Sequence, residues 1–295
     1  RSTLFPYTTL FRSSYYNTKY ICYLCNMVGR KMMLMLFWGL YLLTIQAQED
    51  YLTEKRAVKS DGYPFWIYTP KNYNAYKETT PLILFLHGAS LRGTDMNRVL
   101  RYGSLDAVKM GLEVPALIVA PQNPKGPWNP QKLNDILEWM EKHYVYNRWR
   151  VYMVGMSLGG YGTLDFVGTY PEKIAAAIAL CGGATIKDYR KMGTLPLWII
   201  HGTADRSVKI EESQKVVEGM KKAGVAQRLR YEWIKGASHG DLARYFYLSD
   251  TYDWLFMHTL NEPVRPVDTS IQITADERSN AYRSFTHRKD ELDIR

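Results

Sequence analysis

The sequence predicts an α/β fold in which a mostly parallel sheet is covered by helices on both faces. Apolar runs of five to eight residues alternate with longer amphipathic segments along much of the chain. Several of these runs are apolar throughout, as expected for strands that are buried on both sides. With 295 residues, of which 46% are hydrophobic, the chain can fill one substantial core.

The apolar runs and amphipathic segments follow one another in a regular order. The strand-like runs are residues 63–68, 82–86, 116–120, 151–156, 173–180, 195–201 and 229–234. The predicted helices are residues 131–144, 211–223 and 252–260. In the first helix the apolar residues between Leu133 and Met140 share one stripe, and Asn129 or Pro130 marks its start. We expect residues 63–68 to form an antiparallel edge strand.

A serine between two glycines follows one of these runs directly. Ser157 lies in Gly155-Met-Ser-Leu-Gly159, immediately after residues 151–156. A sharp turn from strand to helix strains the serine backbone and brings neighbouring backbone close, so the flanking residues must be small. A chain of this length contains such a pentapeptide by chance about one time in ten. Ser157 therefore becomes a candidate nucleophile only if partners are found elsewhere.

The partners follow two later strand-like runs. Asp205 comes just after residues 195–201, and His239 lies in the loop after residues 229–234. A serine hydroxyl needs a base to take its proton, and an imidazole with a pKa near ~6.5 suits that role. A carboxylate then orients the imidazole and stabilises its charged form. The sequence thus predicts a catalytic set of Ser157, Asp205 and His239, in that chain order.

Other residues could compete for these roles. Asp188 and Asp241 are alternative carboxylates, and Asp241 is better explained as a helix cap. His201 is the closest rival of His239, but it ends an apolar strand and is interpreted as a structural histidine. His87 is also interpreted as structural.

Backbone N–H groups are expected to bind the oxyanion that forms on the reacting carbonyl. The N–H of Leu158 follows the candidate nucleophile, and the N–H of Ala89 follows the His87-Gly88 pair at the end of residues 82–86. Ser90, Gln122 and Trp128 follow strand ends on the same side of the sheet and are predicted to bind substrate. For Trp128, packing against the edge of the core is an equally good interpretation.

Taken with their order, these motifs resemble those of serine esterases of the α/β-hydrolase superfamily, of the secreted bacterial type related to feruloyl and acetyl-xylan esterases. The resemblance extends from about Asp61 to Leu260. Its landmarks are Phe85-Leu-His-Gly-Ala-Ser, Ala120-Pro-Gln-Asn-Pro, Gly155-Met-Ser-Leu-Gly-Gly-Tyr-Gly, His201-Gly-Thr-Ala-Asp and Ala237-Ser-His-Gly. It implies hydrolysis through an acyl-enzyme, removing acetyl or feruloyl groups from plant polysaccharide or small esters. The resemblance also includes the catalytic portion of prolyl-oligopeptidase-like peptidases, so a serine peptidase and a non-catalytic binding module remain alternatives.

Both ends of the chain are expected to lie outside the catalytic domain, which we assign to residues 48–260. Residues 1–26 are interpreted as a non-native leader. Residues 27–47 have the basic start, short apolar core and small final residue of a signal peptide, which predicts a secreted or periplasmic protein with no stable membrane insertion after cleavage. Residues 261–295 are predicted to be a polar tail of unknown role.

The net charge and the cysteine content say little about the function or the binding partners. Five units of the formal net charge of +9 lie in residues 1–48, and the modest balance that remains does not indicate a nucleic-acid partner. Cys181 is the only cysteine after the leader and is expected to be a small buried thiol. No metal or phosphate-binding motif occurs after the predicted leader and signal peptide, so we predict no cofactor and no metal. The sequence leaves the oligomeric state open.

Overall fold

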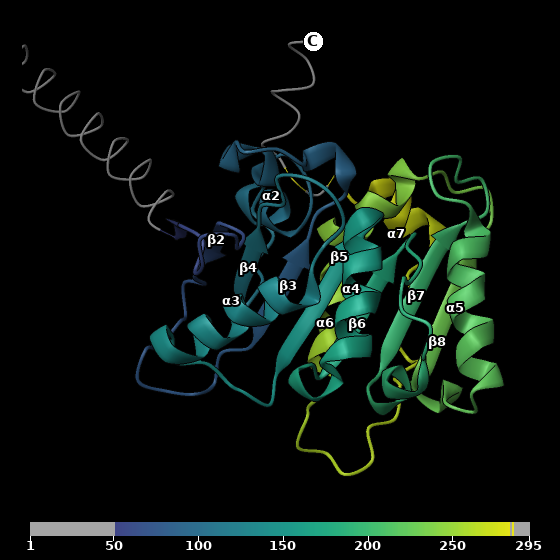
Figure 1. Ribbon diagram of the computed structural model, residues 1–295. Coiled ribbons are helices and arrows are strands. Elements are labelled where there is room, and N and C mark those ends of the chain that lie inside the picture. The colour runs from purple at the N-terminus through teal and green to yellow at the C-terminus, as the bar shows by residue number, and fades with distance from the viewer. Residues whose placement is uncertain (1–50, 284, 286–295) are drawn as a thin grey trace, which may run out of the picture. The chain divides into compact units, whose positions relative to one another are not determined.

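A mixed eight-stranded sheet forms the centre of the computed structural model, which describes residues 51–283 and 285 (Figure 1). The order of its strands is β1-β2-β4-β3-β5-β6-β7-β8. Strands β1, β2 and β4 pair antiparallel, and every pair from β4 through β3 to β8 is parallel. The strands are Leu52–Lys55 (β1), Phe65–Tyr68 (β2), Leu82–Leu86 (β3), Leu117–Pro121 (β4), Val151–Met156 (β5), Ala176–Leu180 (β6), Leu197–Gly202 (β7) and Leu229–Ile234 (β8).

Helices cover both faces of this sheet. The α-helices are Ser104–Lys109 (α2), Pro130–His143 (α3), Leu158–Thr169 (α4), Ile210–Lys222 (α5), Ser249–Phe256 (α6) and Ala275–Asn280 (α7). Short 3₁₀ helices are Ala89–Leu91 (η1), Met96–Leu100 (η2), Pro171–Lys173 (η3), Arg190–Thr194 (η4), Ala226–Arg228 (η5) and Gly240–Tyr247 (η6). This arrangement confirms the predicted α/β fold with a mostly parallel sheet.

Alternate residues of each central strand enter two separate hydrophobic layers, because successive side chains point to opposite faces of a sheet. In β3, Leu84 packs in the layer with helices α3, α4 and α5. Its neighbour Phe85 packs in the opposite layer, with α2, η6 and α6. The central strands β3 to β7 are fully buried, which explains why they are apolar throughout.

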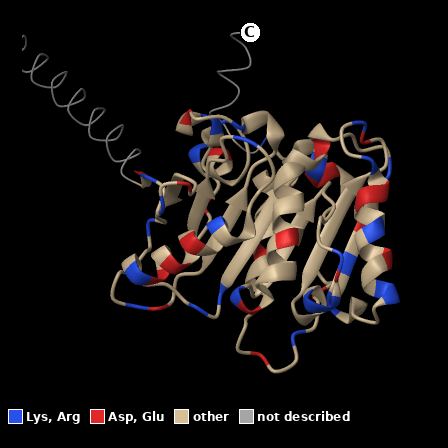
Figure 2. Ribbon diagram, viewed as in Figure 1, with Lys and Arg blue, Asp and Glu red and all other residues tan. Residues whose placement is uncertain are grey.

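The helices differ in charge according to their burial. Figure 2 shows charged residues along the outer side of α5, whereas α4 carries a single acidic residue, Asp165. Helix α3 begins as predicted: the Asn129 side chain accepts hydrogen bonds from the N–H groups of Gln131 and Lys132, and Pro130 occupies the first turn. The predicted apolar stripe of α3 is buried.

The sheet edge lies one strand further out than predicted. Strand β2 was expected at the edge, but β1 pairs with it antiparallel, with Leu52 opposite Tyr68. Strand β1 has only four residues and is half exposed, so its sequence lacks the long apolar run that identifies the central strands.

Part of the segment predicted as a polar tail packs on the domain. Helix α7 begins with a capping box in which Thr274 and Glu277 bond reciprocally. Ile273, Ala281 and Phe285 are buried in the same hydrophobic layer as η6. These residues are far apart in a polar segment, so their burial gives no periodic signal. Within the described residues, no helix is long and apolar enough to cross a bilayer. The predicted leader (1–26) and signal peptide (27–47) lie outside the described residues.

Candidate active site

Ser157 stands at a strained turn between β5 and α4. Its backbone angles are φ 58° and ψ −120°, in a region that residues with a side chain rarely adopt. The Ser157 N–H donates a 2.8 Å hydrogen bond to the carbonyl of Leu180 at the end of β6, which helps to hold this conformation. The side chain is thereby presented beyond the carboxyl end of the sheet, as a nucleophile elbow requires.

The two flanking glycines are required by close backbone packing. A Cβ atom on Gly155 would overlap the backbone of Gly159, and a Cβ on Gly159 would overlap the Leu86 carbonyl at the end of β3. Neither overlap can be relieved by moving a flexible side chain, because the contacting atoms belong to the backbone. The sequence predicts very small residues on both sides of Ser157, and this close approach of the backbone is the physical reason.

Asp205 and His239 form a short hydrogen bond across the loops that follow β7 and β8. His239 Nδ1 lies 2.7 Å from Asp205 Oδ2. A carboxylate can only accept, so Nδ1 carries the proton and Nε2 is left with a lone pair. The Asp205 side chain is fully buried, whereas that of His239 is 23% exposed. The imidazole can therefore take up a proton at Nε2 while a buried carboxylate holds the other nitrogen.

The second oxygen of Asp205 is fixed by its own loop. Oδ1 accepts hydrogen bonds from the N–H groups of Ser207 and Val208, at 2.8 and 2.9 Å. Burial alone raises the pKa of a carboxyl group, but the hydrogen bonds from His239 and the two backbone N–H groups outweigh it and hold the pKa of Asp205 below its usual value. Asp205 thus stays ionised at neutral pH beside the His239 ring.

A second histidine contacts the same carboxylate, which the sequence did not indicate. His201 Nε2 lies 3.3 Å from Asp205 Oδ2 and 3.0 Å from the Val208 carbonyl. Both neighbours are acceptors, so Nε2 carries the proton, while Nδ1 hydrogen-bonds Ser213 Oγ at 2.7 Å. Burial lowers the pKa of His201. His201 is fully buried and distant from solvent, in agreement with its interpretation as a structural histidine.

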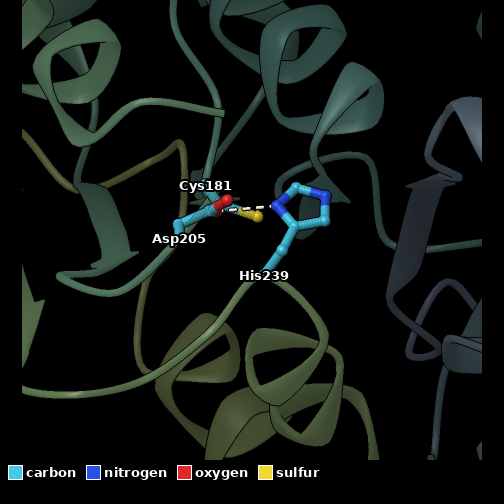
Figure 3. Close-up of side chains that lie close together, drawn as sticks. All are labelled: Cys181, Asp205 and His239. Carbon is cyan, nitrogen blue, oxygen red and sulfur yellow. Dashed lines mark hydrogen bonds and ion pairs between the residues drawn. The ribbon is translucent and has the colours of Figure 1, made fainter. Parts of the chain in front are cut away.

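Cys181 lies beside the Asp205–His239 pair (Figure 3). It follows β6, is free and fully buried, and has an unusual φ of 39°. Its Sγ and the donor atoms of Asp205 and His239 all lie within 4.8 Å of one another, a set that could contact one metal ion. Asp205 and His239 are already bonded to each other, and burial raises the pKa of the Cys181 thiol. These properties fit a neutral thiol packed behind an acid–base pair.

The predicted oxyanion donors lie at the same place. Ala89 begins η1 and Leu158 begins α4, and N–H groups in the first turn of a helix have no partner within it. Both residues line one cavity together with Ser157 and His239. The loop before Ala89 is held by Tyr102, whose hydroxyl accepts a 2.9 Å hydrogen bond from the Gly88 N–H. The backbone of Ala89 and Leu158 thus lies at the wall of the cavity that contains Ser157, where the sequence predicts oxyanion donors.

His87 supports this loop from inside. Its Nε2 accepts a 3.1 Å hydrogen bond from the Asn123 N–H, so Nδ1 carries the proton and donates to the Gly88 carbonyl at 2.7 Å. Burial lowers the pKa of His87 to about 4, which keeps the ring neutral at pH 7. These hydrogen bonds agree with the interpretation of His87 as a structural histidine.

The cavity above Ser157 has a volume of about 690 Å³, within the range of small-molecule sites. Its lining contains no Lys, Arg, Asp or Glu among the described residues. The lining residues are Gly88, Ala89, Ser90, Tyr102, Met156, Ser157, Leu158, Tyr161, Ser207, Val208, His239, Gly240 and Ala243. Of the three predicted substrate-binding residues, only Ser90 is among them.

Gln122 and Trp128 were predicted to bind substrate, but the structure buries both. The Gln122 amide donates to the carbonyls of Leu91 and Gly93, at 2.8 and 2.7 Å, and is fully buried. Trp128 is 4% exposed, and its Nε1 donates to the His87 carbonyl at 3.2 Å. Neither side chain lines the cavity, and both bond to carbonyls of the segment that follows β3. For Trp128, this burial agrees with the alternative interpretation, in which its side chain packs against the edge of the core.

The two alternative carboxylates bind elsewhere. Asp188 forms an exposed ion pair with Arg190. Asp241 accepts hydrogen bonds from the N–H and hydroxyl of Ser238, at 2.9 and 2.7 Å. Among the described residues, Asp205 alone of these three carboxylates bonds His239.

The parallel sheet, the strained serine after β5 and the Asp–His pair after β7 and β8 are together the features of the α/β-hydrolase fold. Comparison with known proteins agrees with this fold, since residues 128–252 match the Dienelactone hydrolase family. The resemblance to α/β-hydrolase esterases expected from the sequence is therefore confirmed.

Two relatives show how far the similarity extends. A bifunctional acetylxylan esterase/xylanase from Neocallimastix patriciarum is 29% identical over 182 residues, which is 59% of this chain and 25% of that protein. A thermostable esterase of known structure superposes with a TM-score of 0.58 at 26% identity, covering 71% of this chain and 64% of the other. The chain thus spans a quarter of the first relative and less than two thirds of the second.

A more distant structure shares the fold alone. The feruloyl esterase module from Clostridium thermocellum superposes with a TM-score of 0.52 at 16% identity, over 68% of this chain and 87% of that one.

Proposed function

We propose that this protein is a serine carboxylic-ester hydrolase that works through an acyl-enzyme. The observation that carries the proposal is the 2.7 Å bond from His239 to Asp205 in a cavity that also contains the strained Ser157. The similarity to the acetylxylan and thermostable esterases supports the same class of reaction.

The chemistry assigns one task to each residue. His239 Nε2 takes the proton of Ser157 Oγ as that oxygen bonds to the ester carbonyl carbon. The carbonyl oxygen becomes an oxyanion that the N–H groups of Ala89 and Leu158 bind. His239 then returns its proton to the alcohol as the ester bond breaks, leaving an acyl group on Ser157. A water molecule, deprotonated by His239, attacks the carbonyl carbon of this acyl group. His239 then gives that proton to Ser157 Oγ as the bond from Oγ to the acyl carbon breaks, and the acid leaves.

The lining of the cavity favours a neutral acyl group. No charged side chain among the described residues faces the space above Ser157, so an acyl group with its own carboxylate would lose hydration without gaining a cationic partner. Tyr102 and Tyr161 offer aromatic surface for an apolar or aromatic acyl group. Acetyl and feruloyl esters, including those on plant polysaccharide, fit this description. The predicted signal peptide would place the enzyme outside the cytoplasm.

Steady-state hydrolysis of matched esters tests the proposal. We expect turnover of p-nitrophenyl acetate and methyl ferulate, and much weaker turnover of p-nitrophenyl hydrogen succinate, whose acyl group carries a carboxylate. Acetylated xylan and an acylated peptide p-nitroanilide, assayed beside them, separate polysaccharide deacylation from peptidase activity.

The control uses two serines of the same cavity. Ser157→Ala should lower kcat at least about 10³-fold in a folded protein. Ser207→Ala should stay within about threefold, because Ser207 contacts Asp205 through its backbone N–H, which the substitution keeps. Equal losses in both variants, or cleavage of the anilide but of none of the esters, would refute the proposed esterase.

A further inference from the structure

His239 lies inside a short turn that the residues on either side of it close. Asp241 Oδ2 accepts a 2.9 Å hydrogen bond from the Ser238 N–H and a 2.7 Å hydrogen bond from the Ser238 hydroxyl. His239 and Gly240 stand between these two residues, and we call residues 238–241 the His239 turn. Because the turn fixes the backbone on both sides of His239, the position of Asp241 helps to determine where the imidazole lies.

Arg244 joins the His239 turn to helix α7. Its Nε lies 3.5 Å from the second carboxylate oxygen of the turn, Asp241 Oδ1. Its Nη1 donates hydrogen bonds to the carbonyls of Arg278 and Ser279, at 3.3 and 3.1 Å. These carbonyls belong to the last turn of α7, where a helix leaves carbonyls without partners and favours a cation. One guanidinium thus connects the end of α7 with the turn that contains His239.

Apolar packing supports the same contact. Helix η6 begins directly after His239 and ends at Tyr247. The Tyr247 ring lies edge-on to Tyr282, with ring centroids 4.7 Å apart, and to Phe285 at 6.4 Å. Phe285 is buried in the hydrophobic layer that also contains Leu242 of η6. The segment that contains α7 is therefore packed against the element that follows the His239 turn.

A second arginine attaches the same segment to the domain at another place. Arg228 Nε donates a 2.9 Å hydrogen bond to the Arg265 carbonyl, and its Nη1 donates a 3.0 Å hydrogen bond to the Gly193 carbonyl. Arg228 directly precedes β8, whereas His239 follows it. The length of the strand separates Arg228 from the His239 turn, so this arginine is a matched control for Arg244.

We propose that Asp241 and Arg244 are positioning residues for the reaction, and that α7 is the support against which they hold His239. The inference rests on the proposed function, because it takes His239 as the base. Neither residue lines the catalytic cavity, so both act through the turn. Arg244 fixes the Asp241 carboxylate, this carboxylate fixes Ser238, and the imidazole keeps the place from which it bonds Asp205.

A positioning role differs from general stabilisation in what it changes. The side chains of Arg244 and Asp241 are 30% and 43% exposed, and an ion pair of this kind contributes little to folding. A catalytic base, in contrast, must stay close to its working geometry, and a small displacement slows the chemical steps. Loss of the pair should therefore lower kcat more than it lowers the melting temperature, and it should leave KM nearly unchanged.

Steady-state hydrolysis of p-nitrophenyl acetate by arginine variants tests this assignment. Arg244→Ala should lower kcat about tenfold and leave KM within about twofold. Arg244→Lys, which keeps a cation beside Asp241, should lose no more than about threefold. Arg228→Ala also removes two hydrogen bonds to backbone carbonyls, and it should keep kcat within about twofold.

Two results would overturn the proposal. Equal losses of kcat in Arg244→Ala and Arg228→Ala would mean that both variants report only on the attachment of the segment. An unchanged kcat in Arg244→Ala would show that the turn holds His239 without α7. If Arg244→Ala fails to fold, Asp241→Ala replaces it, since this variant keeps the bonds from Arg244 to α7 and should show the same tenfold loss.

Amide hydrogen exchange followed by mass spectrometry tests the link without any substrate. The peptide that contains the Ser238 N–H should exchange faster in Arg244→Ala than in the parent protein, and Arg228→Ala should match the parent. Unchanged exchange of this peptide in Arg244→Ala would refute the link to α7, whether or not the protein hydrolyses esters. Faster exchange in Arg244→Ala, with no ester hydrolysis by the parent protein, would instead confirm the link and reject the proposed function.

Discussion

His239 Nδ1 and Asp205 Oδ2 are 2.7 Å apart, and the remaining contacts of Asp205 fix where that bond points. Its other oxygen is held by two backbone N–H groups, and His201 lies 3.3 Å from the bonded oxygen. The carboxylate therefore has little freedom to rotate. It selects the His239 tautomer whose Nε2 has a free lone pair.

Replacement of this carboxylate tests the role of the pair. Asp205→Asn should lower kcat about 10³- to 10⁴-fold in a folded protein, because an amide can donate to Nδ1 and so stabilise the wrong tautomer. Asp188→Asn, which changes an exposed carboxylate paired with Arg190, should leave kcat within about twofold. Similar rates for Asp205→Asn and the parent protein would mean that another group orients the His239 imidazole.

Replacing a glycine beside Ser157 by alanine should damage the fold far more than the same substitution at a nearby glycine whose Cβ position is free of neighbouring atoms. Gly159→Ala should prevent folding or leave the protein inactive, because the new Cβ would overlap the Leu86 carbonyl. Gly240→Ala, beside His239, should fold with a melting temperature close to the parent, since no atom lies within 4 Å of its Cβ position. Circular dichroism melts of both variants decide this. A stable, active Gly159→Ala would show that the elbow relaxes easily.

Trp128 is expected to affect stability more than substrate binding. Trp128→Ala should cost about 3–5 kcal/mol in the free energy of unfolding, because it empties a site that is 4% exposed and packed against His87 and Tyr63. Trp149→Ala, at a tryptophan that is 56% exposed, should change it by no more than about 0.5 kcal/mol. Urea denaturation measures both. A large rise in KM for Trp128→Ala, with unchanged stability, would restore it as a substrate-binding residue.

Two buried histidines predict acid sensitivity of the fold. Burial lowers the pKa of both His87 and His258 to about 4, whereas an unfolded histidine has a pKa near ~6.5. The unfolded state thus binds protons first as the pH falls, so stability should decrease between about pH 6.5 and pH 4. Each histidine can contribute up to about 3 kcal/mol to this loss. Urea denaturation between pH 7.5 and pH 4.5 measures the slope, and His258→Gln should reduce it. An unchanged slope in that variant would mean that His258 does not titrate as its burial implies.

The sequence predicted those parts of the fold and site that depend on local pattern and chain order. The central strands are apolar throughout, and Ser157, Asp205 and His239 each follow a strand end, where a parallel sheet gathers its loops. Cys181 and His201 contact the site through packing across strands β6 and β7, which no spacing along the chain reveals.

Other features could not be predicted because they depend on which way a side chain faces. Gln122 follows a strand end as a substrate-binding residue does, yet its amide turns inward to two carbonyls. Ile273 and Phe285 are buried although the segment around them is polar and shows no repeat. In both cases the partner that decides the orientation is remote in sequence.

The formation of an acyl-enzyme on Ser157 is the most direct test of the proposed mechanism. Protein quenched in acid during turnover of p-nitrophenyl acetate should gain the mass of one acetyl group, on the peptide that contains Ser157, and Ser157→Ala should gain none. Acetyl on another residue such as Cys181, or a full burst of p-nitrophenol from Ser157→Ala, would contradict the account.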